Sequence, residues 1–105
     1  MTTDRSAESG EMNDPLLLDA RRARLLERVR ELRGDLEALR AEYQALPGSG
    51  VLVDTEGIGA LTTPGYCIAG AVEVFEEAQI ELDAAADALD RAGRFTTRLR
   101  PVVFD

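Results

Sequence analysis

The stretch that decides the fold is PLLLDARRARLLERVRELRGDLEALRAEYQAL, residues 15–46. Within it a leucine recurs every seven residues, and apolar residues at this spacing share one face of an α-helix. Asp14 comes directly before Pro15, and an Asp followed by Pro is typical of a helix start, because Asp accepts from free backbone N–H groups while proline lacks one. The pattern predicts one long helix over 15–46. The recurring leucines are Leu18, Leu25, Leu32, Leu39 and Leu46.

A second row lies four residues after the first four leucines. Its members are Arg22, Val29, Leu36 and Tyr43, so the row is apolar except at its N-terminal end. Together the two rows form an apolar face, which we expect to pack against other helices.

A second helix is predicted over 64–92. Thr63 and Pro64 repeat the cap-then-proline signature, and Gly93 is expected to end the helix. Large apolar residues alternate along its seam with small ones, which lets two helix backbones approach closely. The predicted seam consists of Ile68, Ala71, Phe75, Ala78, Leu82, Ala85 and Leu89.

The charges favour antiparallel pairing of these helices. Residues 21–33 hold six Arg and two Glu, whereas the charged residues of 81–90 are all acidic. Antiparallel docking brings the two segments side by side, although each exposed ion pair contributes only about 0–1 kcal/mol. We therefore predict an all-α fold, an antiparallel hairpin of 15–46 and 64–92 that completes a four-helix bundle by dimerisation.

Three regions follow from this division. Residues 1–14 are expected to be a disordered acidic arm, and residues 15–93 a hairpin domain whose loop, 47–63, folds back on it or is disordered. Residues 94–105 form a tail rich in Arg and apolar residues. Either it is a partner-binding peptide, or its Phe95 packs under the hairpin end. Its candidate binding residues are Arg94, Phe95, Arg98, Arg100 and Phe104.

Composition argues against several function classes. A formal net charge of −8 disfavours nucleic acid and anionic membranes as partners. Apolar runs are too short for membrane insertion, and no basic-then-apolar leader opens the chain, so we expect a cytoplasmic protein or one secreted without a cleaved signal peptide.

Catalytic chemistry is not indicated either. The chain has no His and no Lys, and the single Cys67 is interpreted as structural. We expect no catalytic residue, no metal site and no cofactor. A small chorismate-mutase-like enzyme is the best enzymatic alternative on size, but such active sites use a Lys.

The hairpin pattern, the acidic balance, a Gly-containing turn and the segment Gly65-Tyr66-Cys67 leading into the second helix resemble the WXG100 and EspC-like proteins of actinobacterial type VII secretion. The resemblance implies pairing into a four-helix bundle. Two motifs of that family are missing: the chain has no Trp for a W-x-G turn, and the position four residues after each Tyr is Pro47 or Gly70 instead of an acidic residue.

The sequence thus predicts a non-enzymatic interaction protein whose partner is itself, as a homodimer, or another helical protein. The alternative is a coiled-coil adaptor or phage-type assembly component that acts through the loop and the C-terminal tail.

Overall fold

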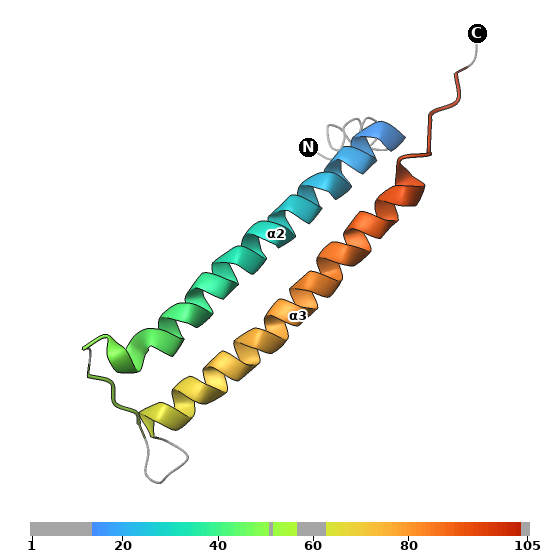
Figure 1. Cartoon of the computed structure of the whole chain (residues 1–105). Coiled ribbons are helices and arrows are strands. Elements are labelled where there is room, and N and C mark those ends of the chain that lie inside the picture. Colours follow the sequence, from blue (N-terminus) through green and yellow to red (C-terminus); the bar gives the residue numbers. More distant parts are fainter. Residues whose placement is uncertain (1–13, 51, 57–62, 104–105) are drawn as a thin grey trace. The chain divides into compact units, whose positions relative to one another are not determined.

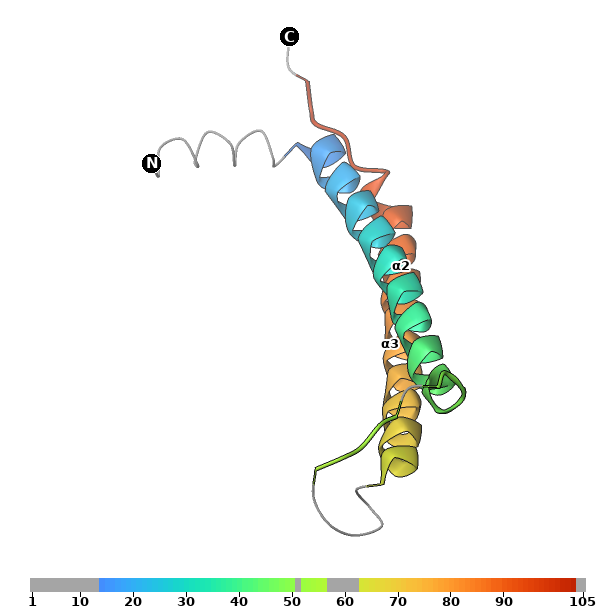
Figure 2. The same ribbon diagram turned by 90° about the vertical axis from the view of Figure 1, so that its left-hand side faces the viewer.

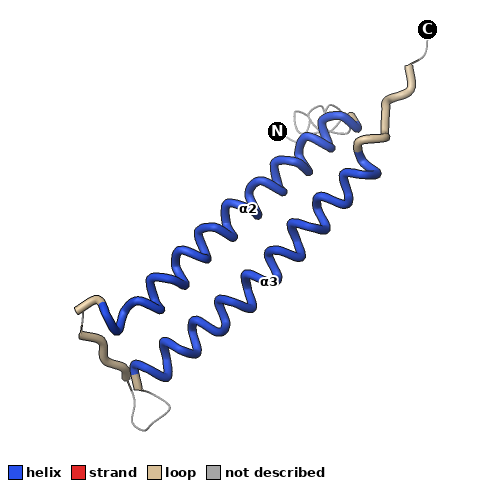
Figure 3. Tube along the Cα trace, in the orientation of Figure 1, coloured by secondary structure: helices blue, strands red, loops and turns tan. Residues whose placement is uncertain are grey.

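The computed structural model describes residues 14–50, 52–56 and 63–103. Two α-helices, α2 (Pro15–Ala45) and α3 (Pro64–Thr96), occur there with one short 3-10 helix, η1 (Leu46–Gly48), and these ranges contain no strand (Figure 3). The helices pack against each other as a hairpin, so the predicted all-α hairpin is confirmed. The predicted disordered arm falls almost wholly on residues 1–13, outside the described ranges.

Both helices begin at the predicted caps. The Leu16 N–H donates to Oδ1 of Asp14 over 2.9 Å, and the Tyr66 N–H donates to Oγ1 of Thr63 over 3.2 Å. Each cap satisfies a backbone donor that the first helical turn leaves without a partner.

The C-terminal end of α3 differs from the prediction. Gly93 does not stop the helix, which continues to Thr96. The helix ends instead where the Thr97 N–H and hydroxyl both donate to the Gly93 carbonyl, over 3.1 and 2.6 Å. Arg100 Nη1 then donates to the carbonyl of Thr97 over 2.6 Å, so a basic side chain satisfies an acceptor beyond the last turn.

The chain divides into two compact units. The terminal unit comprises residues up to Val29 and from Ala84 onward, and the loop unit comprises Arg30–Asp83. Within each unit a segment of α2 lies beside a segment of α3 that runs in the opposite direction (Figures 1 and 2).

Each unit buries very little. In the terminal unit Leu26 is the one buried large apolar residue among those described, with 6% of its surface exposed. In the loop unit the buried residue is Gln79, at 8% exposure. The rings of Tyr43 and Phe75 in the loop unit lie with their centroids 5.5 Å apart and are tilted by 44° to each other, a separation favourable for aromatic pairs.

Candidate interaction surfaces

The predicted leucines of α2 lie at the edge of the helix contact. We call Leu18, Leu25, Leu32 and Leu39 the leucine row; their exposed fractions run from 43% to 55%. Leu46, in η1, is half-buried. The row therefore retains about half of its surface in water after the hairpin has closed.

The other predicted seam residues are mostly half-buried. Ala85 is exposed, and Tyr43 is 39% exposed despite its contact with Phe75. The half-buried positions are Val29, Leu36, Ile68, Ala71, Phe75, Ala78, Leu82 and Leu89.

In the terminal unit the α2 face turned toward α3 carries charged residues. Arg22 Nε donates to Oδ1 of Asp19 over 2.8 Å, and Arg22 Nη1 donates to the Leu89 carbonyl over 3.1 Å. The Thr96 hydroxyl donates to the same Asp19 oxygen over 2.5 Å. These bonds, from Arg22 first and Thr96 second, hold the pKa of the Asp19 carboxyl below its ordinary 3.8.

Gly93 makes the Arg22 contact sterically feasible. A Cβ at this position would lie 2.8 Å from Cζ of Arg22, closer than such atoms approach. The guanidinium therefore lies directly against the α3 backbone, where a larger residue would displace it.

Charged residues also connect the helices of the loop unit. Arg33 Nε donates to Oδ1 of Asp83 over 2.5 Å, and this bond is the main cause that raises the pKa of Arg33 above its ordinary value. Arg40 Nε donates over 2.8 Å to Oε1 of Gln79, which satisfies the buried amide oxygen. The antiparallel charge pairing expected for residues 21–33 is thus realised at Arg33.

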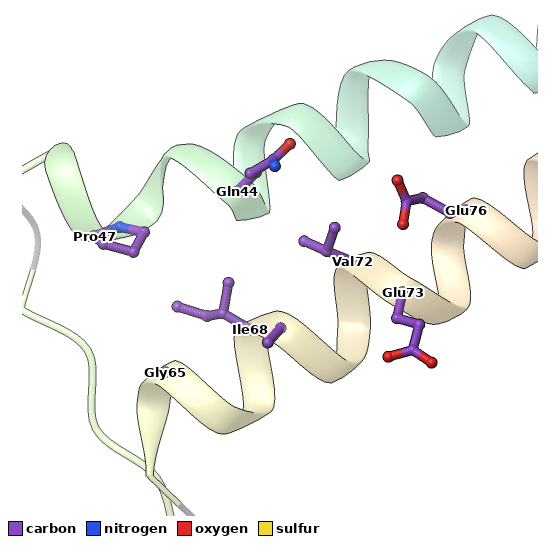
Figure 4. Close-up of a pocket in the computed structure, with 8 residues that line it drawn as sticks. Gln44, Pro47, Gly65, Ile68, Val72, Glu73 and Glu76 are labelled. Carbon is purple, nitrogen blue, oxygen red and sulfur yellow. The ribbon is translucent and has the colours of Figure 1, made fainter.

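A shallow groove lies between the helices at the loop end. Figure 4 shows Ile68 and Val72 directed toward α2 and Glu73 directed away from it. Gln44, Pro47 and Glu76 complete much of its rim. An apolar floor with two carboxylates at the rim suits an apolar side chain of a partner better than it suits a chemical reaction.

The loop is placed beside the hairpin where it is described. Val53, Asp54 and Thr55 line a second hollow together with Tyr43 and Ile68 of the helices. Leu52 is fully exposed, and residues 51 and 57–62 lie outside the described ranges. The 53–55 segment agrees with a loop that folds back.

The predicted tail residues fall into two groups, because α3 ends at Thr96. Arg94 and Phe95 belong to the helix, whereas Arg98 and Arg100 follow it; all four are exposed. Phe95 is 73% exposed, so it does not pack under the hairpin end. Phe104 lies outside the described residues.

Three findings bear on other kinds of site. Within residues 14–50, 52–56 and 63–103, no cluster of three or more Cys, Asp or Glu side chains could hold a metal ion. No helix in those ranges is both long and apolar enough to cross a membrane. Cys67 is exposed, contrary to the semi-buried setting that a structural role suggested.

The charge pairing predicted for residues 21–33 includes Arg33, but the polar contacts of Asp19, Arg40 and Gln79 were not predicted. The other predicted contacts were apolar, whereas these three residues take part in the hairpin contact. The recoverable signal for Asp19 and Arg40 was their spacing, since residues 19, 26, 33 and 40 recur every seven residues.

Comparison with known proteins gives no further guidance. No family model, curated protein or solved structure matches the chain.

Proposed function

We propose that this protein is a non-enzymatic helical interaction protein that binds a second helical surface through the leucine row of α2. The supporting observation is that these four leucines, at heptad spacing, stay about half exposed when the hairpin is closed. A single exposed leucine is ordinary, but a regular row along one helix is typical of an interface.

The energetics support a partner. Covering the exposed half of each leucine side chain is worth about 1 kcal/mol, or about 8 kcal/mol when two such rows meet. That amount is comparable with the about 4–15 kcal/mol that association costs in lost freedom. The neighbouring grooves and the alanines of α3 would supply the remaining association free energy.

A link to type VII secretion stays a prediction of the family resemblance.

The test is the double substitution Leu25→Asp with Leu32→Asp, studied by size-exclusion chromatography with light scattering and by circular dichroism. We expect the wild-type chain to be an assembled helical species and the variant to lose assembly, because the substitutions remove two of the four leucines and their carboxylates would lose hydration in the interface. Ala23→Asp with Ala41→Asp is the matched control, since both alanines are exposed and lie off the row.

Two results would contradict the proposal. One is a folded assembly that survives the leucine substitutions; the other is a wild-type chain that is a stable, fully helical monomer at every concentration and in the presence of other helical chains.

A second candidate, a tail-driven adaptor, is favoured by the exposure of Leu99, Val102 and Val103 after α3. Deleting residues 98–105 in the same experiment separates the two functions. The deletion leaves α3 intact, so the leucine-row proposal expects assembly to persist, whereas the adaptor would stay helical and lose its partner.

A further inference from the structure

A charged row runs beside the leucine row. Arg21, Arg28, Asp35 and Glu42 each lie four residues before a leucine and so share its side of the helix. The two basic members belong to the terminal unit and the two acidic members to the loop unit. We call them the charged row.

The charged row has no partner inside the described part of the chain. Its four side chains take no part in the hydrogen bonds or ion pairs within residues 14–50, 52–56 and 63–103, whereas Arg22, Arg33 and Arg40 are all bonded. The inward arginines thus complete the hairpin, and the charged row faces outward.

We infer that the occupant of the leucine row is the leucine row of a second copy of this chain, running antiparallel. This inference rests on the proposed function and specifies its partner. The basic flank of one copy's terminal unit docks on the acidic flank of the other copy's loop unit, and the contact is repeated by symmetry.

The order of charges determines the direction. With Leu32 where the two α2 helices cross, Leu25 of one copy meets Leu39 of the other. Arg21 then lies beside Glu42 and Arg28 beside Asp35, each pair formed twice.

Other arrangements fit the charges less well. A parallel pair places the charged rows of the two copies on opposite sides of the leucine seam, so they cannot pair with each other, and Arg28 of one copy then faces Arg33 of the other, which is destabilising. Shifting the parallel pair by two heptads does not bring the charged rows together and leaves half of each leucine row uncovered. The α3 helix of a second copy is a poorer partner for the charged row. Its flanking positions at the same seven-residue spacing, residues 67, 74, 81 and 88, hold a single charge, Glu81.

The surfaces of the two units agree with this docking. In the terminal unit Leu25 lies in a depression whose other lining residues are Arg21, Arg24 and Arg28. In the loop unit Leu39 lies in a groove that it shares with Glu42 and Tyr43. A leucine surrounded by bases therefore meets a leucine flanked by acids.

Cysteine cross-linking with a short bis-maleimide tests the direction. All variants carry Cys67→Ser, because the native thiol is exposed. Leu25→Cys, Leu32→Cys and Leu39→Cys are made singly, and the first and third are also mixed.

The antiparallel pair predicts that L32C cross-links with itself, that L25C alone does not, and that the mixture of L25C and L39C does. Cross-linking of L25C alone would show a parallel pair in register. Cross-linking of the mixture without L32C would show the shifted parallel pair. Either overturns the antiparallel inference while the proposed function stands, whereas a monomeric Cys67→Ser parent overturns self-association itself.

Charge reversal gives an independent readout. R28E replaces two attractive pairs by two repulsive ones, so we expect the dimer dissociation constant to rise by roughly tenfold or more at low salt. Adding D35R to R28E should restore it, because the pairs re-form with exchanged signs. Arg91→Glu, at an exposed position of α3 outside the charged row, changes the net charge equally and should have little effect; a dissociation constant indifferent to R28E would overturn the inference.

Discussion

At the scale of the residue, Gly93 shows how one missing side chain shapes the helix contact. Glycine in a helix interior costs about 1 kcal/mol relative to alanine. Here the cost is offset because the Arg22 guanidinium occupies the space of the absent Cβ and bonds to the Leu89 carbonyl. The glycine is thus a contact position rather than a helix terminator.

This explanation predicts a sign change between two backgrounds. In the wild-type chain Gly93→Ala should be neutral or destabilising by up to about 1 kcal/mol, because the gain in helix propensity is cancelled when Arg22 is displaced. In a chain with Arg22→Ala, the same change should stabilise by about 1 kcal/mol. Urea unfolding followed by circular dichroism at one protein concentration measures both; equal effects in the two backgrounds would contradict the role of Arg22.

At the scale of the element, the helix starts were predictable and one end was not. Asp14-Pro15 and Thr63-Pro64 are local chemical signals, and the caps form as expected. The role of Gly93 depends on a contact with α2, since it lies against Arg22, while α3 continues to Thr96. A signal read from one segment cannot reveal a partner that lies far away in the sequence.

The contact face shows a related limit. The heptad leucines correctly indicate an apolar side of α2, but they do not indicate which flank of that side α3 covers. The covered flank includes Arg33 and Arg40, whose long side chains reach acceptors on α3, Asp83 and the amide of Gln79. Long polar side chains bury their apolar stems and keep their polar ends bonded. Apolar periodicity alone therefore underestimates their share of the helix contact.

The hydrogen bonds to Asp19 predict that the contact between the start of α2 and the end of α3 weakens in acid. The folded pKa of Asp19 is lowered, so its stabilisation is present above the unfolded value of 3.8 and is lost as pH falls through the lower folded pKa. Below about pH 4 we expect amides near Thr96 to lose protection, measured as the hydrogen exchange rate relative to the intrinsic rate of the unfolded chain at each pH. Asp19→Asn should flatten this component, and an unchanged acid response in that variant would assign it to other carboxylates.

At the scale of the whole molecule, the shortage of buried surface connects fold to function. Among the described residues a single large apolar side chain, Leu26, is buried, while many others are half or fully exposed. A chain of this size buries a small share of its surface, so its folding free energy is expected to be marginal without a partner. Folding and self-association should therefore be coupled.

Coupled folding makes thermal stability depend on protein concentration. For a dimer that unfolds to two chains, each tenfold rise in concentration adds about 1.4 kcal/mol to the stability of the folded state. With the entropy of unfolding typical of such an assembly, Tm should rise by about 3–5 °C per tenfold increase. Circular dichroism melts over a hundredfold range measure this, with Leu25→Asp plus Leu32→Asp expected to melt at a lower temperature that no longer varies. A wild-type Tm independent of concentration would mean that the hairpin is stable alone, and the exposed leucine row would then need a different explanation.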